Sequence, residues 1–331
     1  MKYKKKIIVF GATGFIGRNI IDKLEKNKNV ELYGTYFNTK PSQKLKKKNV
    51  KLINIDLTDK IKVNNILKGK DIVIQAAAVT TGIQDVIKRP YVHVTDNAVM
   101  NSLIFRSSFK NHIKHVIFFS CTTMYPNIKR AVKEDDFNAK IEDKYFGVGW
   151  TKVYIEKMCE FYSRISKTKF TAIRHSNIYG PHDKYDLQRS HVLGATITKV
   201  MQSKKSSFEV WGDGKEQRDL LYVSDLVDFV VKIINQQKKP FELVNLGSGT
   251  GISIKDLVLK IIKLSDKKLS IIYNNSKPTI KFNLKVNTSK VRKLYNWSPK
   301  VSLDKGILKT LVWYKKNVSF DKKENITIKD I

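Results

Sequence analysis

Three glycines spaced three residues apart follow an apolar run that ends at Phe10. In a turn between a strand and a helix, the first glycine permits a tight exit, the second lets the backbone approach a diphosphate, and the third allows close helix packing. The helix that follows adds free N–H groups and the positive end of its dipole. Because strands and helices continue to alternate downstream, we predict a dinucleotide site in this turn. Its residues would be Gly11, Thr13, Gly14, Phe15, Ile16 and Gly17.

Short apolar runs alternate with helical patterns through the first half of the chain. They predict strands near 30–36, 50–55, 71–78, 115–120 and 170–174, and helices over 96–110 and 150–166. Alternating units of this kind favour an α/β fold: a Rossmann-type, doubly wound parallel sheet with right-handed crossovers. The loops that follow the strands would then share one edge of the sheet and form the site.

The pattern becomes irregular after Gly180-Pro181. We expect a helix over 191–202, a strand over 208–211, helices over 224–236 and 253–264, a strand over 269–273 and a last helix near 303–315. We therefore divide the chain into a dinucleotide-binding domain of residues 1–180 plus 216–249, and a smaller mixed α/β domain of residues 181–215 and 250–318. Residues 319–331 are polar and predict a loose tail.

Composition limits the class of protein. The chain has 331 residues and two cysteines, Cys121 and Cys159, which argues against a disulfide framework and for a cytoplasmic location. No apolar stretch is long enough to span a membrane, and we predict no metal site. The net charge of +33 would suit a polyanion such as nucleic acid, but the lysines are spread over the whole chain without interleaved aromatics. We therefore expect no nucleic-acid partner.

Further motifs extend this pattern over nearly the whole chain. They include Asp56-Leu57, Ala76–Ala78, Tyr125-Pro126, Lys152, the run from Arg174 to Asp183, Ser190-His191-Val192, and the segment from Val210 to Asp225. With them, the chain resembles the extended short-chain dehydrogenase/reductase family of nucleotide-sugar epimerases, dehydratases and reductases, and within it the GDP-L-fucose synthases. The resemblance implies a cytoplasmic enzyme, often a homodimer through the helices near 96–110 and 150–166, that serves the synthesis of a surface-polysaccharide sugar.

The resemblance also implies which residues contact the cofactor. Asp56 and Leu57 would flank the adenine and Lys152 the nicotinamide ribose, with further contacts from Ala76, Ala77, Ala78, Asn97, His175 and Asn177. The end of the second strand, where NAD enzymes commonly carry a carboxylate, has none between residues 33 and 40. Arg18, Asn38 and Lys40 would tolerate or attract a 2′-phosphate. NADP(H) is therefore favoured, with NAD(H) as the alternative.

The catalytic positions depart from the family. Its working acid is the tyrosine of a Tyr-x-x-x-Lys motif, but the residue four positions before Lys152 is Val148. Tyr145 is the one nearby phenol that could bend in from an earlier position. The carboxylate pair of the dehydratases is absent, because Thr122 and Thr123 stand there. A 4,6-dehydratase would therefore lack its acid and base.

Other residues could move protons. His191 matches a histidine that acts as an acid in epimerisation, and Ser190 is expected to cap the helix behind it. Cys121 occupies the serine-type position of the family and Thr123 the position of a catalytic cysteine. Cys121 would act as a thiol acid or base, or simply fill space at a strand end. Cys159 is expected in the core.

The resemblance places Val192, Val210, Trp211 and Arg218 around a nucleoside diphosphate. Alternatives remain for two of them: Arg218 as an ion pair with Asp219 or Asp225, and Trp211 as a core residue. The leading hypothesis is an NADP(H)-dependent epimerase, reductase or both, acting on a GDP-linked 4-keto-deoxy sugar. The alternatives are an epimerase with an idle cofactor, and a dinucleotide- or sugar-nucleotide-binding protein without chemistry.

Overall fold

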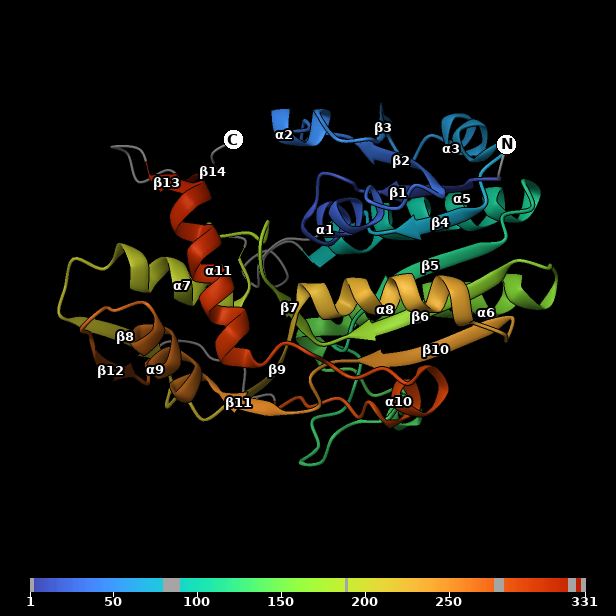
Figure 1. The fold of residues 1–331 in the computed structure, drawn as a ribbon. Helices are drawn as coiled ribbons and strands as arrows, with labels where there is room; N and C mark the ends of the chain where they lie inside the picture. Colours follow the sequence, from blue (N-terminus) through green and yellow to red (C-terminus); the bar gives the residue numbers. More distant parts are fainter. Residues whose placement is uncertain (1–2, 80–89, 188–189, 277–282, 321–325, 329–331) are drawn as a thin grey trace.

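Seven parallel strands form the centre of the protein (Figure 1). We describe residues 3–79, 90–187, 190–276, 283–320 and 326–328 of a computed structural model. The strand order is β10-β6-β5-β4-β1-β2-β3, so the chain winds outward in both directions from β1. This arrangement confirms the predicted doubly wound sheet. The strands are β1 (Lys5–Phe10), β2 (Val30–Tyr36), β3 (Lys51–Asn54), β4 (Ile72–Gln75), β5 (His115–Ser120), β6 (Lys169–His175) and β10 (Phe241–Leu246).

Helices cover both faces of the sheet. On one face lie α1 (Phe15–Leu24), α8 (Val223–Gln236) and α10 (Ser289–Tyr295), and on the other lie α3 (Lys60–Leu67), α5 (Thr95–Lys110) and α6 (Phe146–Arg164). Short elements complete this part: α2 (Gln43–Lys46), η1 (Pro90–His93), η2 (Glu134–Asp136) and η3 (Asp143–Tyr145). Because both faces are covered, the central strands read as continuous apolar runs instead of alternating ones.

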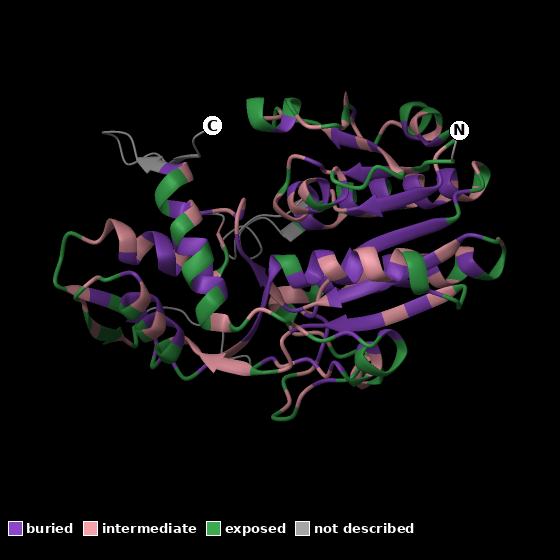
Figure 2. Ribbon diagram, in the orientation of Figure 1, coloured by how far each residue is buried: buried purple, intermediate pink, exposed green. Residues whose placement is uncertain are grey.

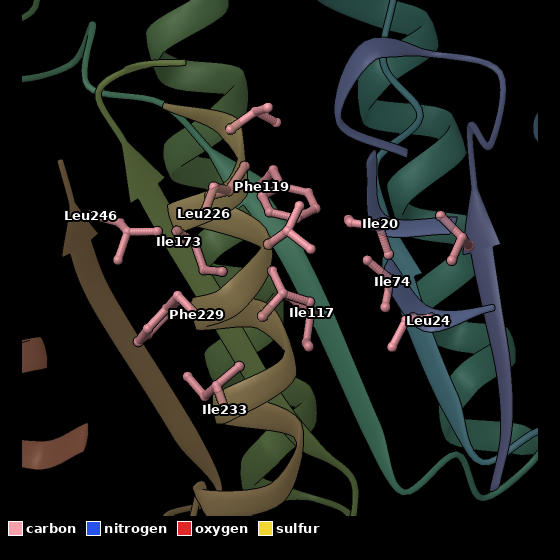
Figure 3. Close-up of a cluster of buried hydrophobic side chains, with 14 of the residues drawn as sticks. Ile20, Leu24, Ile74, Ile117, Phe119, Ile173, Leu226, Phe229, Ile233 and Leu246 are labelled. Atoms are coloured by element: carbon pink, nitrogen blue, oxygen red, sulfur yellow. The ribbon is translucent and has the colours of Figure 1, made fainter. Parts of the chain in front are cut away.

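The core between α8 and the sheet shows how tightly this layer packs. Figure 3 shows side chains of α8 lying against those of β5, β6 and β10, while α1 packs on β4 beside them. Phe229 and Ile233 of α8 are fully buried. In Figure 2 the central strands are buried along most of their length. The sheet is therefore a rigid platform for the loops at its carboxyl edge.

A second lobe has its own apolar core. It contains α7 (Val192–Gln202), β8 (Ser207–Trp211), α9 (Ile254–Leu264), β12 (Ser270–Asn274) and α11 (Leu303–Asn317), with β8 and β12 paired in parallel. A three-stranded sheet of β11 (Gly251–Ser253), β9 (Gln217–Tyr222) and β7 (Asn177–Tyr179) leads from the large sheet into this lobe. Buried side chains fill its core, among them Leu193, Ile197, Phe208, Leu257, Ile261 and Leu311.

Local signals explain where several helices begin. Asp59 caps α3 by accepting from the N–H groups of Ile61 and Lys62, and Ser253 caps α9 by accepting from Asp256. α6 starts at Phe146, four residues before the predicted position. Gly149 lies inside this helix. A Cβ at this position would be only 2.9 Å from the side chain of Ile141, so the glycine allows the two segments to pack closely. The glycine thus serves close packing and does not interrupt the helix.

The C-terminal residues differ from the expected loose tail. β13 (Val318–Phe320) pairs antiparallel with β14 (Ile326–Ile328), while residues 321–325 and 329–331 lie outside the described part. In the sequence, apolar and polar residues alternate in both of these short segments. The neighbouring lysines and asparagines make this alternation hard to recognise. Among the residues described, no helix is both long and apolar enough to cross a bilayer.

Candidate active site

The glycine turn joins β1 to α1 at the carboxyl edge of the sheet. Gly11 has a φ of 76°, and a Cβ there would lie 2.8 Å from the backbone of Ala77. A Cβ on Gly17 would lie 2.0 Å from the carbonyl oxygen of Gly11. Both positions therefore require glycine, one for its backbone angle and both for close approach.

The start of α1 is open for an anion. Gly14 is its N-cap residue, and no side chain caps the helix. The N–H groups of the first turn, which includes Phe15 and Ile16, therefore have no capping partner, and Thr13 lies in the same turn. Thr35 of β2 accepts a hydrogen bond from the Gly11 N–H at 3.2 Å and holds the turn in place. A backbone cradle of this kind fits the diphosphate of a dinucleotide.

The end of β2 would receive the adenosine half. Arg18 is buried, with its Nε 3.1 Å from Asp22 and its Nη1 donating to Ser42 at 3.1 Å. Asn38 and Lys40 are exposed in the preceding loop. The guanidinium is thus held beside the loop in which a 2′-phosphate would lie, with part of its charge offset by Asp22.

The loops after β3 and β4 border the same edge. Asp56 accepts from the N–H and the hydroxyl of Thr58, and Leu57 packs against the core. Ala76 and Ala77 are half-buried and Ala78 is exposed. Small side chains leave the backbone here accessible to a ligand.

Asn97 holds the loop that leaves β4. Its side chain accepts from the Val79 N–H and donates to the carbonyl oxygens of Val79 and His93, each at 3.0 Å. These bonds position the loop, and the predicted contact of Asn97 with the cofactor stays a prediction.

Lys152 of α6 reaches the end of β5. Its Nζ donates to the carbonyl oxygen of Phe119 at 2.9 Å and lies 4.7 Å from the centre of the Phe118 ring. Burial lowers the pKa of Lys152, while Cys121 and Glu156 oppose this shift. The ammonium is thus held close to the first residue after β5.

That residue, Cys121, forms a pair with Thr123. Its Sγ lies 2.9 Å from the Thr123 hydroxyl, and either group can donate. Cys121 is half-buried, whereas Cys159 is fully buried in the core as expected. The thiol and the hydroxyl therefore form one small hydrogen-bonding unit beside Lys152.

Tyr145 lies immediately before α6 and is its N-cap residue, without a side-chain hydrogen bond to the helix. Burial raises the pKa of Tyr145, the cation of Arg218 opposes this shift, and Glu142 and Cys121 add to it. Tyr145 is therefore within electrostatic range of Cys121 and Arg218, although the three residues come from different elements. Val148, at the family's tyrosine position, follows within the first turn of α6.

Two histidines border the site. His175 at the end of β6 donates from Nδ1 to the carbonyl oxygen of Ser176, and burial lowers its pKa to about 4, helped by Lys152 and His191. His191 is exposed, yet the protein around its ring and the charge of Lys184 lower its pKa. Both imidazoles are therefore neutral at neutral pH.

The predicted cap of α7 is wrong. His191 itself is the N-cap residue, without a side-chain hydrogen bond, and the Ser190 hydroxyl is buried without a partner among the described residues. The imidazole is consequently at the helix N-terminus itself. The positive end of the dipole there favours the neutral ring.

The second lobe supplies the remaining candidates. Arg218 on β9 donates to the carbonyl oxygen of Gln217, and burial lowers its pKa. The carboxylate of Asp219 accepts instead from Ser248, Gly249 and Val286. Asn177 on β7 donates to the backbone oxygen of Asp219. These bonds join the end of the large sheet to β9.

Trp211 is not a core residue. Its side chain is 41% exposed, and the ammonium of Lys199 lies 4.9 Å from its ring centre. Val210 is buried in the second core and Val192 packs partly against it. Trp211 therefore presents a ring face at the surface, while the two valines shape the wall behind it.

A buried network behind the site was missed in the sequence. Glu156 forms two hydrogen bonds with Arg174, at 2.9 and 2.7 Å, and accepts from Ser120. Arg174 also donates to Tyr125, which donates to Asn245 at 2.6 Å. The sequence carries no local signal for this pair, because Glu156 and Arg174 lie on different elements, 18 positions apart. This network fixes β5, β6 and α6 relative to one another.

Comparisons with known proteins agree with this geometry. The chain is 29% identical to a GDP-L-colitose synthase of Yersinia pseudotuberculosis over 317 residues, covering 93% of this chain and 97% of that one. It is 28% identical to a GDP-L-fucose synthase of Sinorhizobium fredii over 272 residues, covering 80% and 86%.

Solved structures show the same fold. A UDP-glucose 4-epimerase from Thermotoga maritima superposes with a TM-score of 0.84 at 22% identity, covering 94% of this chain and 99% of that one. A family model matches residues 7–247, which include the glycine turn, Cys121, Lys152 and Arg218. The chain belongs to the NAD dependent epimerase/dehydratase family.

Proposed function

We propose that the protein is an NADP(H)-dependent epimerase, reductase or both, acting on a GDP-linked 4-keto-deoxy sugar. One observation carries the proposal: Lys152 and the Cys121–Thr123 pair lie at the end of β5 and His175 lies at the end of β6, on the same carboxyl edge of the sheet as the glycine turn. Titratable groups with shifted pKa values, here Lys152 and His175, on the sheet edge that carries a backbone anion cradle are typical of an active site. Relatives named for GDP-sugars support the choice of substrate.

The residues present fit a dinucleotide. Gly11, Gly14 and the first turn of α1 would hold the diphosphate, and Lys152 the nicotinamide ribose. When bound, the reduced nicotinamide supplies a hydride. Arg18 and the lack of a carboxylate between residues 33 and 40 support the 2′-phosphate form, NADP(H).

A 4-keto group makes the neighbouring C3–H and C5–H bonds acidic, so a base and an acid near them can invert these centres. Neutral His191 can accept such a proton, because its lowered pKa keeps the lone pair free. The Cys121 thiol, paired with Thr123, can donate one from another side of the site. Arg218 would hold the diphosphate of the nucleotide, and Trp211 would stack on its base.

An epimerase that leaves its cofactor unchanged is the second candidate. The observation that favours it is Val148, which replaces the family's proton-donating phenol next to Lys152. Inversion at C3 and C5 needs no hydride transfer, so it would survive this replacement. Deuterium incorporation from heavy water without cofactor oxidation would select this candidate.

The direct experiment supplies purified protein with NADPH and GDP-4-keto-6-deoxy-mannose in heavy water. We expect deuterium at C3 or C5, together with loss of the NADPH absorbance if reduction also occurs. The proposal is wrong if neither signal develops with this substrate or with UDP-linked 4-keto sugars.

We also propose that the protein is a homodimer through α5 and α6. Large apolar side chains on these helices, and at the C-cap of α6, are exposed: Val99, Tyr154, Phe161 and Ile165 are between 41% and 55% exposed. Burying them against a second copy would remove this area from water. We expect a dimer in sedimentation experiments and a shift to monomer for Phe161→Glu, whereas a monomeric wild type would refute this assembly.

A further inference from the structure

The loop of residues 120–125 begins at the end of β5 and carries the hydrogen-bonded pair of Cys121 and Thr123. Its two ends, Ser120 and Tyr125, are each 1% exposed, whereas Cys121 is half-buried. Both end residues use their hydroxyl groups in hydrogen bonds to side chains of other elements. The loop therefore has a buried anchor at each end, with the candidate proton donor between the two anchors.

One buried ion pair binds both anchors. The carboxylate of Glu156 accepts from the Ser120 hydroxyl at 2.5 Å. Nη1 of Arg174 donates to the Tyr125 hydroxyl at 2.9 Å. Glu156 and Arg174 bind each other through two hydrogen bonds, at 2.9 and 2.7 Å, and are only 4% and 3% exposed. The two ends of the loop are thus joined to each other through one carboxylate and one guanidinium.

The sheet brings two of these side chains together. Ser120 and Arg174 are paired across β5 and β6, and both bind the carboxylate of Glu156 on α6. The next residues along the two strands are Cys121 and His175, which are both candidate site residues. Glu156 therefore holds the strand position directly before each of them.

The same helix binds the end of β5 a second time. Lys152 lies one turn before Glu156 on α6, and its Nζ donates to the carbonyl oxygen of Phe119 at 2.9 Å. Residues four apart on a helix lie on the same face, so a cation and an anion of α6 bind two successive residues of β5. These bonds fix the position of α6 along the strand and hold the ammonium of Lys152 beside the loop.

Stability alone does not account for this arrangement. Replacing a buried ion pair with apolar side chains of similar volume often leaves stability unchanged or raises it. The pair adds direction, because a guanidinium and a carboxylate joined by two hydrogen bonds have a defined mutual orientation. Their remaining polar atoms are therefore at fixed places, where they bind Ser120 on one side and Tyr125 on the other.

We propose that Glu156 and Arg174 are positioning residues that set the place of Cys121 by holding its loop at both ends. This inference rests on the proposed function, in which Cys121 supplies a proton during epimerisation. Both residues are buried behind the loop and act through it. Because a displacement of about 1 Å in a reacting group can lower a rate about 100-fold, release of one anchor should lower the rate and leave cofactor binding intact.

The first test releases one anchor at a time and leaves the ion pair in place. For Ser120→Ala and for Tyr125→Phe we expect kcat for deuterium exchange at C3 or C5 to fall about tenfold, with KM and NADPH affinity unchanged. The matched controls are Ser163→Ala on α6 and Tyr185→Phe in the second core, since these buried hydroxyl groups bond to nearby backbone oxygens instead. The controls should keep the wild-type kcat, and a wild-type kcat in both anchor variants would overturn the proposal.

A second variant separates orientation from charge. Arg174→Lys keeps the positive charge beside Glu156 but cannot reproduce the forked hydrogen bonds of the guanidinium. We expect kcat to fall as in Tyr125→Phe, and the addition of Tyr125→Phe to Arg174→Lys should change it little, because both substitutions release the same anchor. A wild-type kcat in Arg174→Lys would show that charge alone matters and would refute the positioning role.

A third readout needs neither sugar nor cofactor. Alkylation by iodoacetamide, followed by mass spectrometry, measures how accessible the Cys121 thiol is, and buried Cys159 is the internal control that should stay unlabelled. Release of an anchor should let the loop open, so Ser120→Ala and Tyr125→Phe should be alkylated at Cys121 several-fold faster than the wild type. Equal rates in the three proteins would mean that the anchors do not hold the loop. A wild type that exchanges no sugar hydrogen would refute the proposed epimerisation instead, and the alkylation rates would still test the anchors.

Discussion

The two halves of the candidate site are built on different principles. The dinucleotide half consists mainly of backbone: a glycine turn, an uncapped helix N-terminus and the small residues after β4. The catalytic half consists of side chains that depart from the family pattern, with Val148, Cys121 and Thr123 at three of its working positions. Family membership and fold follow from the first half, whereas the reaction depends on the second.

This difference has a physical origin. Main-chain N–H groups bind phosphate whichever side chains surround them, provided that glycine permits the approach. Proton transfer requires a particular group with a suitable pKa at one place. The rigid sheet can therefore retain its ligand while the groups around the reacting carbon change. Separate measurements of binding and rate should distinguish the two halves.

The largest effect is expected for Gly17→Ala. The new Cβ would lie 2.0 Å from the Gly11 carbonyl oxygen, so the turn must open. We expect a loss of about 3 kcal/mol in stability and an NADPH affinity about 100-fold weaker. Gly69→Ala is the control for backbone strain alone, because Gly69 has a φ of 66° but a Cβ there meets nothing within 4 Å. Equal NADPH affinities for the two variants, measured by calorimetry, would contradict the cradle.

In the catalytic half, Cys121→Ala should separate rate from binding. Removing the thiol deletes the group that is hydrogen-bonded to Thr123. We expect deuterium exchange at C3 or C5 to fall about 100-fold with NADPH affinity unchanged. Cys159→Ala serves as the control, since this thiol is buried in the core away from the site. Exchange at the wild-type rate in Cys121→Ala would assign the proton transfer elsewhere.

Arg18→Ala tests the cofactor choice with a smaller expected effect. The guanidinium lies beside Ser42, so its loss should reduce the preference for NADPH over NADH about tenfold. Lys23→Ala on the same helix removes a charge that pairs with Asp228 instead. The ratio of the two dissociation constants is the readout, and a ratio unchanged by Arg18→Ala would place the 2′-phosphate elsewhere.

The smallest effect concerns Asp183, between the two lobes. Burial raises the pKa of its carboxyl from 3.8 to about 7, so the folded protein keeps a proton that the unfolded chain loses near pH 4. The stability due to this proton is present below about pH 4 and lost as the pH rises through about 7. Asp183→Asn keeps the acceptor for the Lys184 N–H and removes the titration.

We therefore expect the free energy of unfolding of the wild type to fall by about 1 kcal/mol more than that of Asp183→Asn between about pH 6 and about pH 7. Urea titrations at the two pH values measure it. Parallel behaviour of the two proteins would mean that this carboxyl is ionised throughout.

Much of the fold could be predicted from the sequence because its signals are local. The strands 30–36 and 115–120 are found where the apolar runs predict them, and the glycine turn follows its strand directly. The C-terminal hairpin of β13 and β14 was not predicted from the sequence, because the alternation of apolar and polar residues covers only three residues in each strand. The cap of α7 was misplaced by one residue, since Ser190 and His191 are both polar and only the backbone decides between them.

The site was less predictable because it depends on long-range contacts. Asn97 was identified from the sequence as a candidate site residue, but its bonds to Val79 depend on how α5 packs beside β4. The pairing of Glu156 with Arg174 joins a helix to a strand, and nothing in either segment alone reveals it. Likewise, the electrostatic coupling of Tyr145 with Arg218 joins two segments that are far apart in the sequence.

Calorimetric titration of the purified protein with NADPH tests the central claim most directly. We predict saturable binding that Gly17→Ala weakens about 100-fold and that Cys121→Ala and Tyr145→Phe leave intact, which would show a complete dinucleotide half beside an altered catalytic half. If neither NADPH nor NADH binds to the folded wild type, the glycine turn is a structural turn alone, and the proposed reaction falls with it.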